Sequence, residues 1–164
     1  MVNLKYFSGT VTMISDISFG QNAEEEGCYK LISADNGGGS LVNFIVSPST
    51  YFIDQAMVTI GDRVTGYYDG NAPVPLIYPP QYRALVMVKH NPYQNVKADY
   101  FDSQLISSDG QLKLNISPIT QPVLTNGQAF TKTIANRNLI VIYGPSTKSI
   151  PAQTTPYKII VLCL

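Results

Sequence analysis

The chain has 164 residues, of which 45% are hydrophobic and only 13% are charged, a composition that excludes a disordered chain and supports a sizeable core. Eleven Lys and Arg residues balance eleven Asp and Glu residues, so no net field attracts phosphate backbones or an anionic membrane surface. Nucleic acid is therefore an unfavourable partner for this protein.

The N-terminal stretch, residues 1–8, lacks the basic start and the apolar core of a secretory signal. No apolar run in the chain approaches the roughly 20 residues that a membrane span requires. We therefore expect neither a signal peptide nor a membrane span here. The expected location is the cytoplasm, or the surface of a cell or spore.

Strand patterns begin at residues 7–13, where apolar or small residues alternate with Ser and Thr. A hairpin is predicted next, with strands at 29–33 and 41–46 around a Gly-rich turn. The Glu run at 24–26 indicates a solvated loop tip and not a calcium site, because neighbouring residues of a strand point in opposite directions. One short helical turn, around residues 49–54, is the only helix expected.

The segment from residue 69 to 82 is rich in proline, which makes it stiff and leaves few backbone donors for a sheet. Its last residues, 79–82, also satisfy the Pro-Pro-x-Tyr pattern that WW modules bind. Two interpretations stay open: the segment plugs one end of a barrel with Leu76, Ile77 and Tyr78, or it contacts a ligand. The ligand-binding candidates are Tyr67, Asp69, Tyr78, Tyr82 and Arg83.

Few residues are suited to catalysis or metal binding. His90 is the only histidine, so neither a zinc site nor a Ser-His-Asp relay has its usual ligands or partners, and we expect a surface histidine. The two cysteines, Cys28 and Cys163, are predicted to be buried and unpaired. Carboxylates could pair as acid and base, although Asp more often caps turns; the residues concerned are Asp54, Asp62, Asp69, Asp99 and Asp102. No metal, no cofactor and no enzymatic activity are predicted.

An internal repeat is the most informative feature of the sequence. Four blocks recur in order: 31–35 as 105–109, 45–48 as 115–118, 63–68 as 138–143 and 82–86 as 157–161. We therefore predict an all-β protein with two tandem repeats, 1–92 and 93–164. Each repeat would form a small OB-like barrel of five strands, the two packed together. The alternative is one merged β-sandwich, because the last strand is apolar on both faces.

Two Pro-rich stretches also carry a resemblance to a known family. They are Asn71-Ala72-Pro73 with Ile77-Tyr78-Pro79-Pro80-Gln81-Tyr82, and the segment 143–156, which begins Tyr-Gly-Pro-Ser-Thr-Lys. On these motifs the chain resembles an uncharacterised family of tandem β-repeat modules from clostridial-type Gram-positive bacteria. Some members of that family lie in cell-surface proteins that also carry a copper amine oxidase N-terminal-like domain. The resemblance implies a surface module and supplies no catalytic residue.

Taken together, these patterns predict a non-enzymatic β module that binds or scaffolds at a cell or spore surface. Its expected partners are proteins or glycans, because neutral, Tyr-rich surfaces suit both. Two other functions stay open. A hydrolase would need two carboxylates in one cleft, and a binder of single-stranded nucleic acid would need a continuous basic groove.

Overall fold

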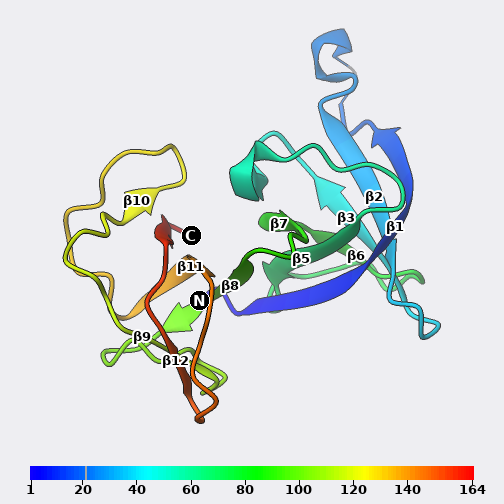
Figure 1. Ribbon diagram of the computed structural model, residues 1–164. Coiled ribbons are helices and arrows are strands. Elements are labelled where there is room, and N and C mark those ends of the chain that lie inside the picture. The colour runs from blue at the N-terminus through cyan, green and yellow to red at the C-terminus, as the bar shows by residue number, and fades with distance from the viewer. Residues whose placement is uncertain (21) are drawn as a thin grey trace. The chain divides into compact units, whose positions relative to one another are not determined.

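The computed structural model describes residues 1–20 and 22–164 and is all-β (Figure 1). The chain divides into two compact units, Met1–His90 (unit 1) and Asn91–Leu164 (unit 2). Within the described residues the only helices are two 3-10 turns, η1 (Ala23–Glu25) and η2 (Ile53–Gln55). No helix in this part of the chain has the length and apolar character to cross a bilayer.

Unit 1 is one seven-stranded sheet in the order β4-β7-β5-β1-β2-β3-β6. The strands are β1 (Leu4–Ile17), β2 (Tyr29–Asp35), β3 (Leu41–Val46), β4 (Tyr51–Phe52), β5 (Arg63–Asp69), β6 (Gln81–Arg83) and β7 (Val86–Lys89). The sheet is open, so the predicted closed barrel of five strands is wrong. Closure would require β4 to pair with β6, but each of these short strands pairs only with its inner neighbour, in parallel.

The long strand β1 belongs to both parts of this sheet. Leu4–Thr10 pair with β5, and Thr10–Ile17 pair with β2, with a bulge between Val11 and Met13. Gly9 lies where the two pairings meet, and a Cβ there would be 2.7 Å from the Asp35 carbonyl oxygen. Glycine at this position therefore lets the neighbouring backbone approach closely while the strand changes partners.

A single hydrophobic core holds the two parts of the unit 1 sheet together. It comprises Val11, Ile32, Ala34, Val42, Phe44, Val46, Val64, Ala84 and Met87. Phe44 on β3 is fully buried, and a Cβ at Gly66 on β5 would lie 2.5 Å from its ring. Because β3 and β5 are not neighbours in the sheet order, this contact shows that the sheet folds back onto itself around Phe44.

Unit 2 has a four-stranded sheet, β10-β13-β11-β8, and a two-stranded sheet, β12-β9. The strands are β8 (Asn95–Phe101), β9 (Leu112–Leu114), β10 (Val123–Leu124), β11 (Arg137–Tyr143), β12 (Ala152–Thr154) and β13 (Lys158–Leu162). Isolated bridges from Phe101 to Ser107 and from Ile106 to Lys113 connect the two sheets. The core of this unit comprises Phe101, Leu112, Leu114, Ile134, Leu139, Val141, Ile159 and Val161.

The strands of the two units pair in the same order. Unit 1 has the order β4-β7-β5-β1-β2-β3-β6. In unit 2 the corresponding order is β10-β13-β11-β8, then the segment 105–107 in the place of β2, and then β9-β12. The registers differ from the predicted alignment at two places. Phe101 bridges to Ser107 where Val11 pairs with Ala34, so Ser107 matches Ala34 and not the predicted Ser33. The second difference follows the loop after β5 and β11. Leu85 N donates to Tyr67 O in unit 1, and Tyr157 N donates to Ile142 O in unit 2. Tyr157 thus matches Leu85 and not the predicted Tyr82, because the loop in unit 2 is shorter.

Both cysteines are free and exposed. The prediction that Cys28 and Cys163 are unpaired is confirmed, and the prediction that they are buried is wrong. Cys28 follows η1 in a loop where its thiol donates to the Glu24 carbonyl oxygen at 3.4 Å. Cys163 lies just beyond β13, after the continuous buried run of Ile159–Leu162.

Candidate functional site

The loop between β5 and β6, residues 70–80, carries the largest exposed apolar side chains near the predicted site. Leu76 is 102% exposed, Tyr78 71% and Ile77 52%. The plug interpretation is therefore wrong, because these side chains are not inserted into a barrel. Where the loop rejoins the sheet, the Tyr68 and Tyr82 rings already pack against the core of unit 1.

The start of this loop is held by the Asp69 carboxylate. Its Oδ1 atom accepts the backbone N–H groups of Asn3 at 3.0 Å and Asn71 at 2.9 Å. These two hydrogen bonds, that of Asn3 first, hold the pKa of Asp69 below its usual value. Gly70 N also donates to Asn3 O at 2.7 Å, so the loop is pinned to the beginning of β1.

The other end of the loop is held against the β2–β3 hairpin. Asn43 N donates to Pro80 O at 2.9 Å, and the Tyr78 hydroxyl donates to Gly39 O at 3.4 Å. With proline at several positions between these anchors, the loop has few conformations to lose when a partner binds. It thus presents an apolar tip on a constrained backbone.

Two of the candidate tyrosines support the fold beneath the loop. Tyr67 is 6% exposed on β5, with its ring 5.8 Å from that of Tyr6. Tyr82 is half-buried on β6 and stacks on Tyr68, with ring centroids 3.9 Å apart and planes 2° from parallel. Because Tyr82 is engaged in this stack, the Pro-Pro-x-Tyr motif does not present its tyrosine as WW modules require.

Arg83 lies on β6 next to a small aromatic cluster. Its guanidinium carbon is 5.9 Å from the centroid of the Phe19 ring, and Phe19 meets Tyr29 edge-on at 5.3 Å. Arg83 and Phe19 are both exposed. The sequence did not predict this cluster, since Phe19, Tyr29 and Arg83 come from separate segments without any shared motif.

The Tyr68–Tyr82 stack predicts an alkaline transition. Burial, and then the neighbouring Tyr82 phenol, raise the pKa of Tyr68 to about 12. A tyrosine whose folded pKa exceeds its unfolded value of about 10 contributes stability that is complete below pH 10 and is lost as the pH rises toward 12.

We expect the melting temperature to fall between pH 10 and pH 12, and to fall less in Tyr68→Phe. Thermal melting against pH checks this, with Tyr93→Phe, an 88% exposed ring, as the control. An identical alkaline loss in Tyr68→Phe would contradict the assignment.

His90 is exposed, in agreement with the predicted surface position, but it is also part of a polar chain. Its Nε2 atom is 2.8 Å from Thr65 Oγ1, which is 2.6 Å from Ser8 Oγ. Partial burial, and then the nearby Arg63, hold the pKa of His90 below its usual value. Within the described residues no serine hydroxyl contacts the imidazole directly. The series of hydrogen bonds from His90 through Thr65 to Ser8 therefore differs from that of a Ser-His-Asp relay.

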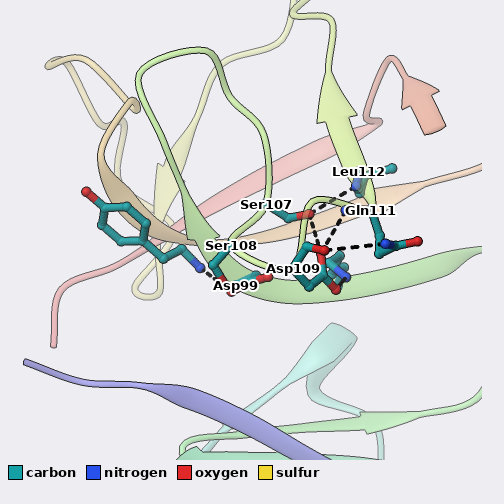
Figure 2. Close-up of polar contacts among 8 residues, drawn as sticks. Asp99, Ser107, Ser108, Asp109, Gln111 and Leu112 are labelled. Atoms are coloured by element: carbon teal, nitrogen blue, oxygen red, sulfur yellow. Dashed lines mark hydrogen bonds and ion pairs between the residues drawn. The ribbon is translucent and has the colours of Figure 1, made fainter. Parts of the chain in front are cut away.

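Four of the five aspartates that could have formed catalytic pairs, Asp62, Asp69, Asp99 and Asp102, bind backbone N–H groups. Asp62 accepts from Thr59 N at 2.8 Å, and Asp102 from Gln104 N at 2.9 Å. Figure 2 shows the buried Asp99, whose Oδ1 atom accepts from Tyr100 N at 2.7 Å and from the Ser108 hydroxyl at 2.5 Å. These contacts are those of aspartates that cap turns and strand ends.

A second set of contacts in Figure 2 builds the turn before β9. Asp109 Oδ1 accepts from the Ser107 hydroxyl at 2.6 Å and from Gln111 N at 3.0 Å, while Leu112 N donates to Ser107 Oγ at 3.0 Å. Lys97 pairs with the other oxygen of Asp109 at 2.5 Å. These contacts hold the pKa of Asp109 below its usual value, against the opposing effect of its burial. The network closes a tight turn in unit 2.

No group of three or more His, Cys, Asp or Glu side chains within residues 1–20 and 22–164 is placed to hold a metal ion. No protein-family model, no curated protein and no solved structure matches the chain. The candidate site is therefore the β5–β6 loop, judged on its own geometry.

Proposed function

We propose that this protein is a non-enzymatic binding module that holds a protein or glycan partner through its β5–β6 loop. The observation that carries the proposal is the exposure of Leu76, Ile77 and Tyr78 on a loop anchored at both ends. The setting at a cell or spore surface rests on the family resemblance of the two Pro-rich stretches.

The energetics of the loop favour binding over a role in stability. Large apolar side chains that stay in water contribute nothing to the core, and burying one against a partner is worth about 1.5–3 kcal/mol. The anchors at Asp69 and Pro80 reduce the entropy that closure on a partner would cost. An exposed apolar tip on a constrained loop is thus suited to contact another molecule.

Tyr78 is the candidate that the proposal places in direct contact with the partner. Its ring can stack on a sugar or an apolar side chain while its hydroxyl hydrogen-bonds. Asp69 and Tyr82 act as supports that hold the two ends of the loop, and Tyr67 packs beneath it. Arg83, exposed beside Phe19, is the one candidate that brings a positive charge to a ligand.

The chemistry of the loop suits a neutral partner. Residues 70–80 contain no charged side chain, and the whole chain carries a formal net charge of zero. The binder of single-stranded nucleic acid is less well supported, because it needs cations along a groove. A hydrolase is also less well supported, because Asp62, Asp99 and Asp102 are committed to hydrogen bonds with backbone N–H groups.

We also infer that the two units arose by duplication of one β module of the OB-like type, in an open form. The shared order of strand pairing supports this inference, since the six strands of unit 2 and the segment 105–107 pair in the order of the seven strands of unit 1. Unit 2 would then carry the same framework with a shorter loop.

Replacing Leu76 with Ser and Tyr78 with Ala together tests the proposed site. Because both side chains are exposed, the free energy of unfolding should change by no more than about 0.5 kcal/mol. Binding to the partner should weaken by about tenfold or more, as expected for the loss of a hot-spot aromatic. Thermal melting and retention on a printed glycan array and a panel of purified surface proteins measure the two effects.

The matched control is Ile119→Ser, which removes an apolar side chain that is 93% exposed elsewhere in the chain. It should leave both melting and retention unchanged. If the double variant melts like the wild type and is retained by the same ligands with the same strength, the binding site lies outside the β5–β6 loop.

A further inference from the structure

Unit 1 carries a β-hairpin that unit 2 does not have. We call residues 12–20 and 22–33 the arm: the outer part of β1, the described part of the loop that holds η1, and most of β2. In Figure 1 the arm extends from the rest of unit 1 as the blue and light-blue strands β1 and β2. Val11 pairs with Ala34 at its base, and in unit 2 Phe101 pairs with Ser107 at the corresponding place. In unit 2 the short segment 102–106 connects Phe101 to Ser107.

The arm is therefore not required by the fold. Unit 2 forms the same order of strand pairs without it, and connects β8 to residues 105–107 through a short turn in which the Asp102 carboxylate accepts from Gln104 N and Ile106 N. Additions to a working framework are where binding residues concentrate, because they can vary without loss of the core. This comparison within one chain indicates that the arm has a role other than stability.

The outer part of β1 presents a free edge. Met13–Ile17 pair with β2 on one side, and no other strand of the described chain pairs with them on the other. Backbone N–H and C=O groups on such an edge are a template for another strand, and proteins usually guard them with Lys, Pro or very short strands. This run has no Lys and no Pro, and its one charge, Asp16, is paired with Lys30 on β2.

The side chains of this edge alternate between two faces. Ile14 packs against the core of unit 1, so Met13, Ser15 and Ile17 lie on the opposite face. Met13 is 45% exposed there. On the same face, Ser15 lies beside its pairing partner Leu31 on β2, and Leu31 lies beside its partner Ile45 on β3. The outer face of the arm is thus a half-exposed, largely apolar surface that ends at an unpaired edge.

We propose that this edge pairs antiparallel with the same edge of a second copy of the chain, about a two-fold axis at Ser15. In this register Ser15 faces Ser15, and Met13 faces Ile17 of the second copy, which covers the exposed methionine with an apolar side chain. Asp16 faces Ile14, so no like charges meet. A register centred on Asp16 would set two carboxylates opposite each other and is disfavoured.

Two properties favour a second copy over a different strand. The edge is complementary to itself in this register, as a two-fold interface requires. The chain has a formal net charge of zero, so copies do not repel one another as they approach. The dimer would join the outer part of β1, β2, β3 and β6 of each copy into one continuous sheet.

Sedimentation velocity over a wide range of protein concentration tests the proposal on the full chain. The wild type should show a concentration-dependent dimer. Ser15→Lys sets two ammonium groups opposite each other and should weaken dimerisation by about tenfold or more. Ser15→Thr, which suits a strand, should retain it. Ser103→Lys, the same change at an exposed turn of unit 2, is the matched control and should dimerise like the wild type.

Cross-linking checks the register independently of stability. Opposed residues of antiparallel strands have Cα atoms about 4.5–5.5 Å apart, within the range of a disulfide. With Cys28 and Cys163 replaced by Ser, Ser15→Cys should form a disulfide-linked dimer on mild oxidation, and Ser103→Cys should not. A monomer at every concentration, a dimer that Ser15→Lys leaves unchanged, or equal cross-linking at both positions would overturn the proposal.

Discussion

Replacing Phe101 with alanine is expected to destabilise unit 2 by about 3–5 kcal/mol, the usual effect of deleting a buried aromatic ring. Phe101 ends β8, is fully buried, and packs among Leu112, Leu139 and their neighbours in the core of unit 2. Its backbone also bridges to Ser107, so it connects the two sheets of this unit. A cavity at this position removes contacts on both sheets at once.

Hydrogen exchange measured segment by segment is the appropriate test, because the two units have separate cores. In Phe101→Ala the slowest amides of β11 and β13 should lose protection. The control is Phe130→Ala, which removes a half-buried aromatic at the margin of the same core and should have a smaller effect. Equal losses in the two variants would contradict the central place of Phe101.

Gly66→Ala is expected to destabilise unit 1 by about 1–3 kcal/mol through overpacking. The added Cβ would lie 2.5 Å from the Phe44 ring, which is fully buried and has no free space into which to move. Gly38→Ala is the matched control, because its Cβ would meet nothing closer than 3.5 Å. Urea unfolding followed by tyrosine fluorescence and by hydrogen exchange of β3 and β5 measures both.

A double-mutant cycle distinguishes this clash from a general loss of glycine. Phe44→Leu shortens the side chain that faces Gly66, so it should relieve part of the cost of Gly66→Ala. The double variant should then be more stable than the sum of the two single effects predicts. If the effects of the two single substitutions are additive, the destabilisation by Gly66→Ala comes from the backbone and not from a clash with the Phe44 ring.

The two units also clarify which parts of unit 1 are available for function. Unit 2 achieves the same order of strand pairs with a shorter β11–β12 loop and without the arm. The β5–β6 loop is therefore longer than its counterpart and the arm has no counterpart in unit 2, and each leaves apolar groups exposed, as at Leu76 and Met13. For this reason the proposed partner site and the proposed self-association site are assigned to these two elements.

Much of the fold could be predicted from local sequence patterns. The alternation at residues 7–13 and the Gly-rich turn after β2 correctly indicated strands, because side-chain direction alternates along any strand. The absence of any capped apolar stripe correctly excluded long helices.

Other features were decided only by contacts between residues far apart in the sequence. The sheet is open because β4 and β6 do not pair, and Leu76 is exposed while the Tyr68 and Tyr82 rings at the ends of its loop pack against the core. No local pattern encodes either fact. The three-residue offset at Tyr157 likewise follows from loop length, which a gapless alignment ignores. Sequence alone thus determined the secondary structure of this protein, and tertiary packing decided which side chains remained free to bind.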